Sequence, residues 1–211
     1  TTPPALDGSW KGWESVPVIT FGLHQDQIRK STLPDENYSG PNDVTGKFRL
    51  MWDDKFLYLG VEALDDVFVT QPERGKSGFM GDSIEFAFQP DNLMTQQAPR
   101  YEFELYLPDG KPPYAASRRF PLDKAGMIDT WMASVTPTGK RADVNYQVAI
   151  PWSDLGVEKP SAGKTISFAL VLNDCDTPGR LGGGRGRILW FGGLDGGKNP
   201  EMYGDVTLVE P

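Results

Sequence analysis

Cysteine and histidine are almost absent from the sequence. Cys175 is the only cysteine and His24 the only histidine among 211 residues. A lone thiol cannot form an internal disulfide or a cysteine-based metal cluster, so we expect Cys175 to be a small buried hydrophobe. With one imidazole, and without a Gly-x-Ser-x-Gly turn or a His-Glu-x-x-His helix, the chain lacks the signatures of a nucleophile triad and of a zinc protease. We expect His24 to lie in a surface loop.

Long apolar runs and clusters of positive charge are also missing. No stretch reaches the roughly 18 apolar residues that indicate a membrane span. The formal net charge is −8 at pH 7, and the lysines and arginines are spread along the chain singly or in adjacent pairs. The sequence therefore lacks the basic stripe that binds phosphate backbones or anionic lipids. We expect neither nucleic acid nor a membrane to be a partner.

Turn-forming residues and short β-rich runs are abundant instead. The chain has 24 glycines and 18 prolines, and no apolar pattern of helical period lasts long enough for a substantial helix. The spacing of the runs predicts an all-β fold, a two-sheet antiparallel β-sandwich of the jelly-roll or immunoglobulin type, in a single domain over residues 1–211. The expected strands are 16–21, 46–52, 56–63, 83–89, 101–106, 131–136, 145–150, 165–172, 187–191 and 204–209. We expect at most one or two short helical turns, one of them at Ser153-Asp154-Leu155.

A series of short motifs runs through nearly the whole chain. They are Leu6-Asp7-Gly8 with Trp10, Leu50-Met51-Trp52-Asp53-Asp54, Leu57-Tyr58-Leu59-Gly60-Val61 with Asp65-Asp66, Gly81-Asp82-Ser83-Ile84-Glu85-Phe86, Ala149-Ile150-Pro151-Trp152-Ser153-Asp154-Leu155-Gly156, Phe168-Ala169-Leu170-Val171-Leu172-Asn173-Asp174 and Tyr203-Gly204-Asp205-Val206-Thr207-Leu208. Each motif alone is common, but their content and order together resemble carbohydrate-binding module family 9. The resemblance implies a non-catalytic β-sandwich related to sugar- and heme-binding domains of the dopamine-hydroxylase-like type. Such domains are usually appended to a polysaccharide-degrading enzyme and often hold structural calcium.

The resemblance also implies where a sugar binds. In the family two tryptophans clamp a terminal sugar. Phe79 stands at the position of the first tryptophan. The second belongs in the glycine-rich loop after Trp190, which here carries Lys198 and Asn199 but no tryptophan. The family's polar partners map onto two neighbouring strands that carry Glu85 and Glu104. The candidate ligand-binding residues are Phe79, Glu85, Glu104, Tyr106, Trp190, Lys198 and Asn199. Alternatively, both glutamates are solvated strand positions and the loop is only a turn.

The tryptophans can pack in the core instead of contacting a ligand. Trp10, Trp13, Trp52 and Trp152 lie beside strand and turn motifs, so we expect them to pack in the interior. For Trp131 and Trp190 the sequence leaves both roles open.

Acidic clusters make calcium the expected cofactor, because calcium takes about six to eight oxygen ligands and needs neither histidine nor cysteine. The clusters are Asp65-Asp66, Asp82, and Asn173-Asp174 with Asp176. The resemblance favours an ion near Asp65, Asp66 and Asp82. Plain turn residues are the alternative, since none of the clusters follows the EF-hand pattern.

Other functions remain open at this point. Glu85 and Glu104 on adjacent strands can lie about 5–10 Å apart, as the two carboxylates of a glycosidase do, but nothing in the sequence indicates the burial that raises one pKa, so we expect no enzyme. A b-type heme domain is the main alternative, with ligands from Met80, Met94, Met127, Met132 or Met202 and His24 or a lysine. The second alternative is a spacer domain that binds no ligand. We expect a secreted, periplasmic or extracellular protein whose partners are an oligo- or polysaccharide and a fused or neighbouring glycoside hydrolase or lyase.

Overall fold

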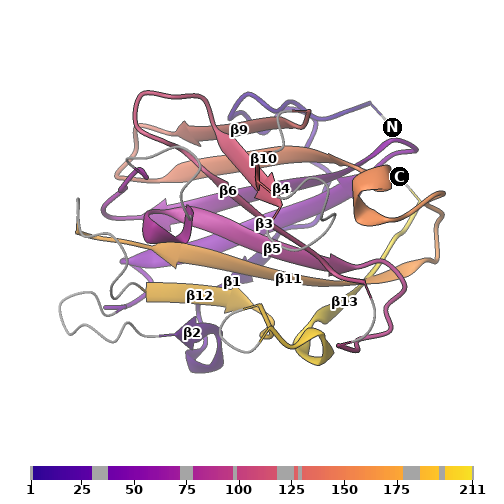
Figure 1. The fold of residues 1–211 in the computed structure, drawn as a ribbon. Coiled ribbons are helices and arrows are strands. Elements are labelled where there is room, and N and C mark those ends of the chain that lie inside the picture. The colour runs from indigo at the N-terminus through magenta and orange to yellow at the C-terminus, as the bar shows by residue number, and fades with distance from the viewer. Residues whose placement is uncertain are drawn as a thin grey trace.

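Two antiparallel sheets, packed face to face, form the body of the protein in the computed structural model (Figure 1). The structure describes residues 2–29, 38–71, 78–96, 99–117, 126–127, 130–177, 186–194 and 198–210. The predicted all-β sandwich is therefore confirmed. Within the described residues, no helix has the length and the apolar character that crossing a membrane requires.

The first sheet has the strand order β1-β3-β4-β10-β9. Its strands are β1 (Ile19–Phe21), β3 (Val44–Trp52), β4 (Phe56–Asp65), β10 (Val144–Pro151) and β9 (Met132–Pro137). A hairpin joins β3 to β4, with Trp52 opposite Leu57. Asp53 fixes the turn because its Oδ1 accepts hydrogen bonds from the backbone N–H groups of Lys55 and Phe56, both at 2.8 Å.

The second sheet has the order β2-β12-β11-β5-β6-β7-β8. Its strands are β2 (Ile28–Arg29), β12 (Gly186–Trp190), β11 (Thr165–Asp174), β5 (Ser83–Gln89), β6 (Tyr101–Tyr106), β7 (Tyr114–Ser117) and β8 (Gly126–Met127). A further strand, β13 (Gly204–Thr207), pairs with the first part of β11, whereas β12 pairs with its second part. The chain between β12 and β13 is therefore free to leave the sheet and fold onto its outer face.

Short 3-10 helices are more frequent than predicted. They are η1 (Gln25–Gln27), η3 (Gly78–Met80), η5 (Trp152–Leu155) and η6 (Pro200–Met202). Only η5 lies where the sequence places a helical turn. It follows Pro151 and ends at Gly156, which has a left-handed conformation with φ of 68°.

The core lies between the sheets and follows the two-residue period of the strands. Phe86, Phe88 and Phe168 face the first sheet, and the rings of Phe88 and Phe168 stack at 4.8 Å. The expected interior tryptophans Trp13, Trp52 and Trp152 are buried, as is Trp131, while Trp10 is half-buried with the guanidinium of Arg49 4.3 Å from its ring. Cys175 is buried and His24 is exposed, as expected.

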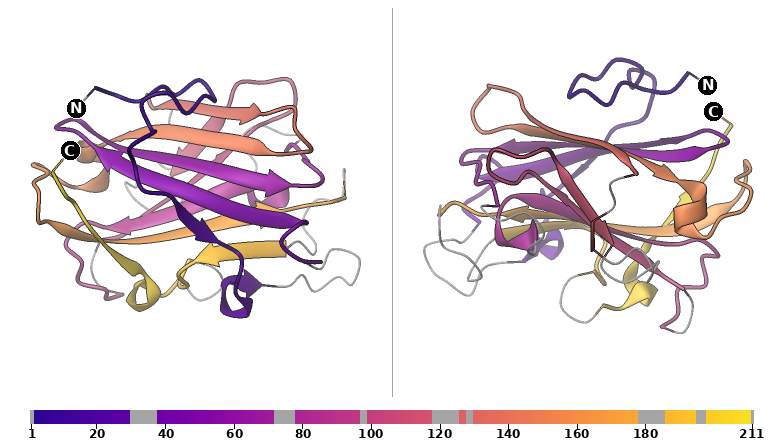
Figure 2. Two further views of the ribbon diagram at one scale, coloured as in Figure 1. Left: turned by 180° about the vertical axis from the view of Figure 1, so that it is seen from behind. Right: turned by 45° about the horizontal axis from the view of Figure 1, so that its top comes forward.

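The N-terminal segment closes the outer face of the first sheet (Figure 2, right). Trp13 is fully buried there against Tyr58 and Ala149. Gln147 of β10 anchors the segment, since its Oε1 accepts from the N–H of Gly8 at 2.9 Å and its Nε2 donates to the carbonyl of Ser9 at 2.5 Å. The candidate ligand-binding glutamates Glu85 and Glu104 belong to the other sheet.

Candidate functional site

Carboxylates line the outer face of the second sheet. Glu85 of β5 is the direct cross-strand partner of Glu104 of β6. Because Phe86, Phe103 and Leu105 point into the core, strand alternation turns the glutamates outward. Glu102, two residues before Glu104, shares this face.

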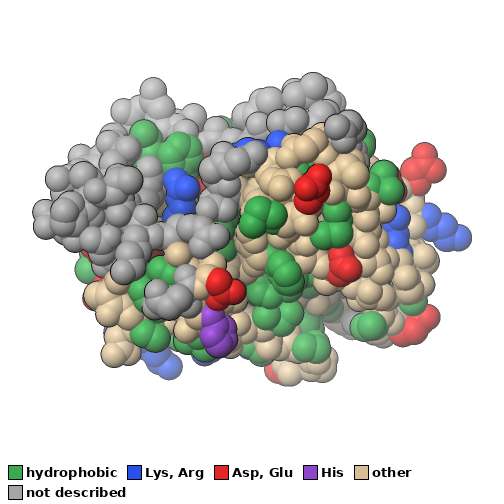
Figure 3. Space-filling model, turned by 90° about the horizontal axis from the view of Figure 1, so that it is seen from below, with side chains coloured by type: hydrophobic (Ala, Val, Ile, Leu, Met, Phe, Trp, Pro, Cys, Tyr) green, Lys and Arg blue, Asp and Glu red, His purple; other side chains and the backbone are tan. Residues whose placement is uncertain are grey.

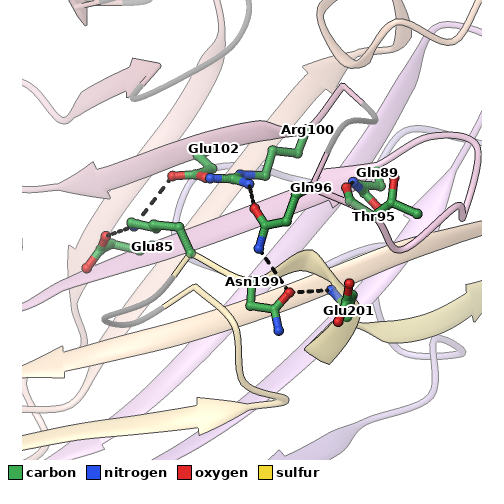
Figure 4. A network of polar contacts seen from close by, with 9 residues as sticks. Glu85, Gln89, Thr95, Gln96, Arg100, Glu102, Asn199 and Glu201 are labelled. Carbon is green, nitrogen blue, oxygen red and sulfur yellow. Dashed lines mark hydrogen bonds and ion pairs between the residues drawn. The ribbon is translucent and has the colours of Figure 1, made fainter.

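A cation spans two of these carboxylates (Figure 4). Lys198 Nζ lies 3.4 Å from Glu102 Oε2 and 3.9 Å from Glu85 Oε2. Arg100 Nε lies 2.6 Å from Glu102 Oε1, and both of these side chains are at most 5% exposed. The buried Arg100–Glu102 pair thus fixes the carboxylate that the more exposed Lys198 approaches.

An amide chain joins this pair to the loop after β12. Arg100 Nη1 donates to Gln96 Oε1 at 3.0 Å, and Gln96 Nε2 donates to Asn199 Oδ1 at 3.1 Å. The same Asn199 oxygen accepts from the N–H of Glu201 at 3.2 Å and so caps η6. We call Glu85, Gln96, Arg100, Glu102, Lys198 and Asn199 the outer-face cluster.

Asn173 of β11 extends the outer-face cluster across the sheet. Its Nδ2 donates to Glu85 Oε1 at 3.0 Å and to Ser83 Oγ at 3.1 Å. Its Oδ1 is buried and accepts no hydrogen bond within the described part of the chain. Such an oxygen is an acceptor for a hydroxyl group that reaches it.

Small residues let the loop reach the cluster. Ala87 and Ala169 lie beside each other on the outer face, and Leu194 and Tyr203 pack onto them. Tyr203 is 2% exposed, so this contact buries a large aromatic side chain and holds the C-terminal end of η6 on the sheet.

The η3 helix covers the other candidate residues. Glu104 is 1% exposed, and its Oε2 accepts from the N–H of Gly78 at 3.0 Å. Tyr106 is fully buried under Gly78, where an added Cβ would lie 2.3 Å from the tyrosine ring. The alternative of a solvated position is therefore wrong for Glu104, and Tyr106 does not offer its ring to a ligand. Phe79 follows Gly78 on η3 and is half-buried.

Trp190 lies apart from the outer-face cluster. In β12 the side chains of Ile188 and Trp190 point inward, and the Trp190 ring lies 4.9 Å from Phe48 and 5.4 Å from Phe168. The structure thus brings Glu85, Lys198 and Asn199 together and separates Trp190 from them.

The predicted acidic clusters converge on a single region. Asp65, Asp82 and Asp174 are buried, and their ligand atoms lie within 4.8 Å of one another. The groups Asp65, Asp66, Asp176 and Asp43, Asp174, Asp176 meet the same limit. Asp43, directly before β3, was not among the acids that the sequence indicated.

Burial and mutual repulsion dominate the electrostatics of these acids. Burial, with repulsion from Asp176 and Asp66, raises the pKa of Asp65 to about 7. Burial and repulsion from Asp65 raise the pKa of Asp174 to about 9 and that of Asp82 well above its ordinary value. One oxygen of Asp174 is buried without a hydrogen bond in the described region.

These acidic residues offer only oxygen ligands, and one oxygen of Asp174 has no hydrogen-bond partner in the described region. Both features fit calcium. Each carboxylate supplies hard oxygen ligands, and the acids come from four separate segments of the chain. Asp82 is already oriented, because its Oδ2 accepts from the N–H of Val69 at 2.5 Å and its Oδ1 from that of Cys175 at 2.7 Å.

Comparison with known structures agrees with the fold. A family 9 carbohydrate-binding module from Caldicellulosiruptor kristjanssonii, solved in complex with cellotriose, has a TM-score of 0.69 and 18% identity, covering 99% of this chain and 91% of that one. The glucose complex has a TM-score of 0.67 and 19% identity, covering 98% and 91%. A protein from Bacteroides uniformis ATCC 8492 has a TM-score of 0.58 and 10% identity, covering 93% and 88%. At these identities the likeness concerns the fold.

The sequence gives a family assignment of its own. No curated protein matches it. Residues 23–211 match the family described as "Carbohydrate family 9 binding domain-like", which spans most of the chain, and nothing in the comparisons favours heme. The chain belongs to this family of non-catalytic carbohydrate-binding domains.

Proposed function

We propose that the outer-face cluster is the saccharide-binding site of this domain. The observation that carries the proposal is the approach of Lys198 to both Glu85 and Glu102, on a face where buried pairs hold the polar groups in place. Carboxylates accept hydrogen bonds from sugar hydroxyls, and the lysine and the asparagine amide donate them. The cluster therefore has both partners that a hydroxyl group needs.

Glucose-containing saccharides are the first ligands to test. The structural neighbour from Caldicellulosiruptor kristjanssonii was solved with cellotriose and with glucose. Phe79 is an aromatic residue of η3, the helix that packs against β5 and β6, which carry the glutamates. A half-buried ring there supplies an apolar surface to the C–H face of a pyranose.

Calcium is a structural part of the same proposal. Asp65, Asp82 and Asp174 would hold an ion, with Asp43, Asp66 and Asp176 beside them. A bound ion would supply positive charge where the described residues form no ion pair with these three aspartates. The ion would stabilise the fold, because its ligands lie at the ends of β4 and β11 and at the start of β5, and it would connect these strands.

The biological setting that we propose is consistent with family membership. In this proposal the domain acts outside the cytoplasm, together with a fused or neighbouring glycoside hydrolase or lyase, and keeps that enzyme on its polysaccharide. The domain itself transforms nothing.

Calorimetric titration of the metal-loaded protein with glucose and cellotriose tests the sugar site. Glu85→Gln keeps the side-chain volume but weakens a charged acceptor, so we expect affinity for both sugars to fall about tenfold. Glu62→Gln is the matched control, because Glu62 pairs with Lys47 on the other sheet. Wild-type affinity in both Glu85→Gln and Lys198→Met would overturn the proposal.

A further inference from the structure

A cavity lies at the edge of the second sheet, where β12 ends. Its volume is about 470 Å³, and the described residues around it include Asp26, Gln27, Trp190, Phe191 and Met202. Figure 3 looks at this side of the molecule from below Figure 1 and shows hydrophobic side chains gathered in the middle of the face, near the only histidine. We call this cavity the edge pocket.

Phe191 is held in an unusual conformation at the rim of the edge pocket. Its φ is 61°, in the left-handed region that bulky residues rarely adopt. The ring lies edge-to-face against Trp190 at 4.7 Å, and it rests on Gly204, where an added Cβ would come within 2.3 Å of the ring. The side chain is nevertheless 51% exposed. The fold thus strains its backbone and fixes an aromatic ring while leaving half of it open to solvent.

Met202 completes an apolar wall beside Phe191. It is 48% exposed, and a Cβ added to Gly192 would lie 2.6 Å from its terminal methyl group. The absence of a side chain at Gly192 therefore lets the thioether pack closely over the loop. A ring and a flexible thioether together offer apolar surface that adapts to the shape of a ligand.

Polar groups lie on another side of the edge pocket. Gln27 is fixed, since its Oε1 accepts from the N–H of Gly22 at 3.0 Å, which leaves its NH₂ group as the donor of that amide. Asp26 adds a carboxylate. A pocket with an apolar wall and a few placed polar groups suits a ligand that has both characters, and its volume lies within the range of roughly 300–1,000 Å³ for small-molecule sites.

The edge pocket is connected to the outer-face cluster through η6. Asn199 of the cluster caps this helix, and Met202, which lines the pocket, is its last residue. The Met202 N–H donates to the Asn199 carbonyl at 3.2 Å, so one 3-10 turn separates the two sites. Three residues of 3-10 helix rise roughly 6 Å, a spacing close to one sugar unit.

We propose that the edge pocket is a second saccharide subsite, in which Phe191 and Met202 contact the C–H face of one pyranose unit while another unit of the same chain lies on the outer-face cluster. A pyranose presents an apolar C–H face and hydroxyl groups together, which matches this combination of lining residues. The inference rests on the proposed sugar-binding function and adds that the site accommodates a chain rather than a single sugar.

The test compares glucose with cellotriose by calorimetry on the metal-loaded protein. Wild type is expected to bind cellotriose about tenfold more tightly than glucose. Phe191→Ala and Met202→Ala are expected to remove most of this difference and to leave glucose affinity within twofold. Phe191→Leu keeps an apolar side chain without the ring, and Val209→Ala, which truncates a side chain that is 72% exposed, is the control. Melting curves establish that each variant is folded.

The outcomes separate the two proposals. If Glu85→Gln weakens glucose binding while Phe191→Ala and Met202→Ala leave cellotriose affinity unchanged, the sugar-binding function holds and the second subsite is wrong. A loss of glucose and cellotriose affinity by equal factors in Phe191→Ala also overturns the subsite, because the edge pocket then belongs to a single site. If the wild-type protein binds neither sugar, both proposals are wrong.

Discussion

Arg100 and Glu102 form the buried ion pair on which the outer-face cluster rests. Both side chains are at most 5% exposed, so each charge has lost most of its water and depends on the other. Glu102 also faces Lys198, and Arg100 also contacts Gln96. A change at Arg100 therefore affects stability and the position of the loop together.

Replacing Arg100 by Met is expected to reduce the free energy of unfolding by about 3 kcal/mol, because it leaves the Glu102 carboxylate buried with only a half-exposed lysine nearby. Urea denaturation gives the difference from wild type. Lys47→Met breaks a more exposed pair with Glu62 and should cost about 0–1 kcal/mol. Equal losses in the two variants would contradict the role of burial.

At the scale of residues, the sequence predicts part of the site. The resemblance pointed to Glu85, and the glycine-rich loop pointed to Lys198 and Asn199; the structure brings the three together. Glu102 was missed although it stands two residues before Glu104, and the two-residue period of a strand was enough to place both on one face. The burial of Glu104 and Tyr106 was not predictable in this way, because it comes from η3, which arrives from a different part of the chain.

The N-terminal segment and the loop between β12 and β13 have opposite roles at the scale of elements. The first covers one sheet with buried aromatic rings, and the second carries polar side chains onto the other sheet. In our proposal the outer face of the first sheet serves stability alone, whereas that of the second sheet also binds the saccharide.

Trp13→Ala is expected to lower the free energy of unfolding by about 3–5 kcal/mol, because it removes a fully buried indole from the contact with Tyr58 and Ala149. The same variant should bind cellotriose within twofold of wild type, since Trp13 lies on the opposite sheet from the outer-face cluster. Denaturation and calorimetry on one preparation measure both quantities. A parallel loss of affinity in folded protein would show that the two sheets are coupled.

Strands with a clear alternating pattern were predicted to within a few residues, and the differences have local causes. β1 begins at Ile19 rather than at residue 16, and Pro17 in this stretch has no N–H to donate to a partner strand. β12 ends at Trp190 because Phe191 takes a positive φ. β2, β7 and β8 were missed, since two to four residues are too few to show a period.

At the scale of the whole molecule, the buried aspartates connect parts of the chain that lie far apart in sequence. Asp65, Asp82 and Asp174 stand in separate clusters of the sequence; the resemblance joined Asp65 and Asp82, and only the fold adds Asp174 to them. Composition identifies acids that can bind calcium, but sequence separation hides which of them meet.

These aspartates make the stability of the metal-free protein depend on pH. The pKa of Asp65 rises from 3.8 to about 7 and that of Asp174 to about 9 on folding, so the folded state holds protons that the unfolded state releases. The corresponding stability is full below about pH 4 and is lost as the pH rises through 7 to 9. We expect the metal-free protein to melt at lower temperature at pH 8 than at pH 5, with a free-energy difference on the order of a few kcal/mol.

Calcium should reverse this trend, because the ion requires the deprotonated carboxylates and binds more tightly as the pH rises. Melting curves in chelator and in excess calcium at both pH values measure the effect. Asp174→Asn should abolish most of the calcium-dependent gain, whereas Asp91→Asn, at a side chain that is 63% exposed, should preserve it. A melting temperature that calcium leaves unchanged at pH 8 would rule out the ion.

A crystal structure of the domain bound to the saccharide that ranks highest on a glycan array tests the central claim most directly. We expect sugar hydroxyls within hydrogen-bonding distance of the Glu85 carboxylate and of the Lys198 and Asn199 side chains. A sugar bound to the other sheet, or an array on which the folded, calcium-loaded domain binds nothing, would contradict the account.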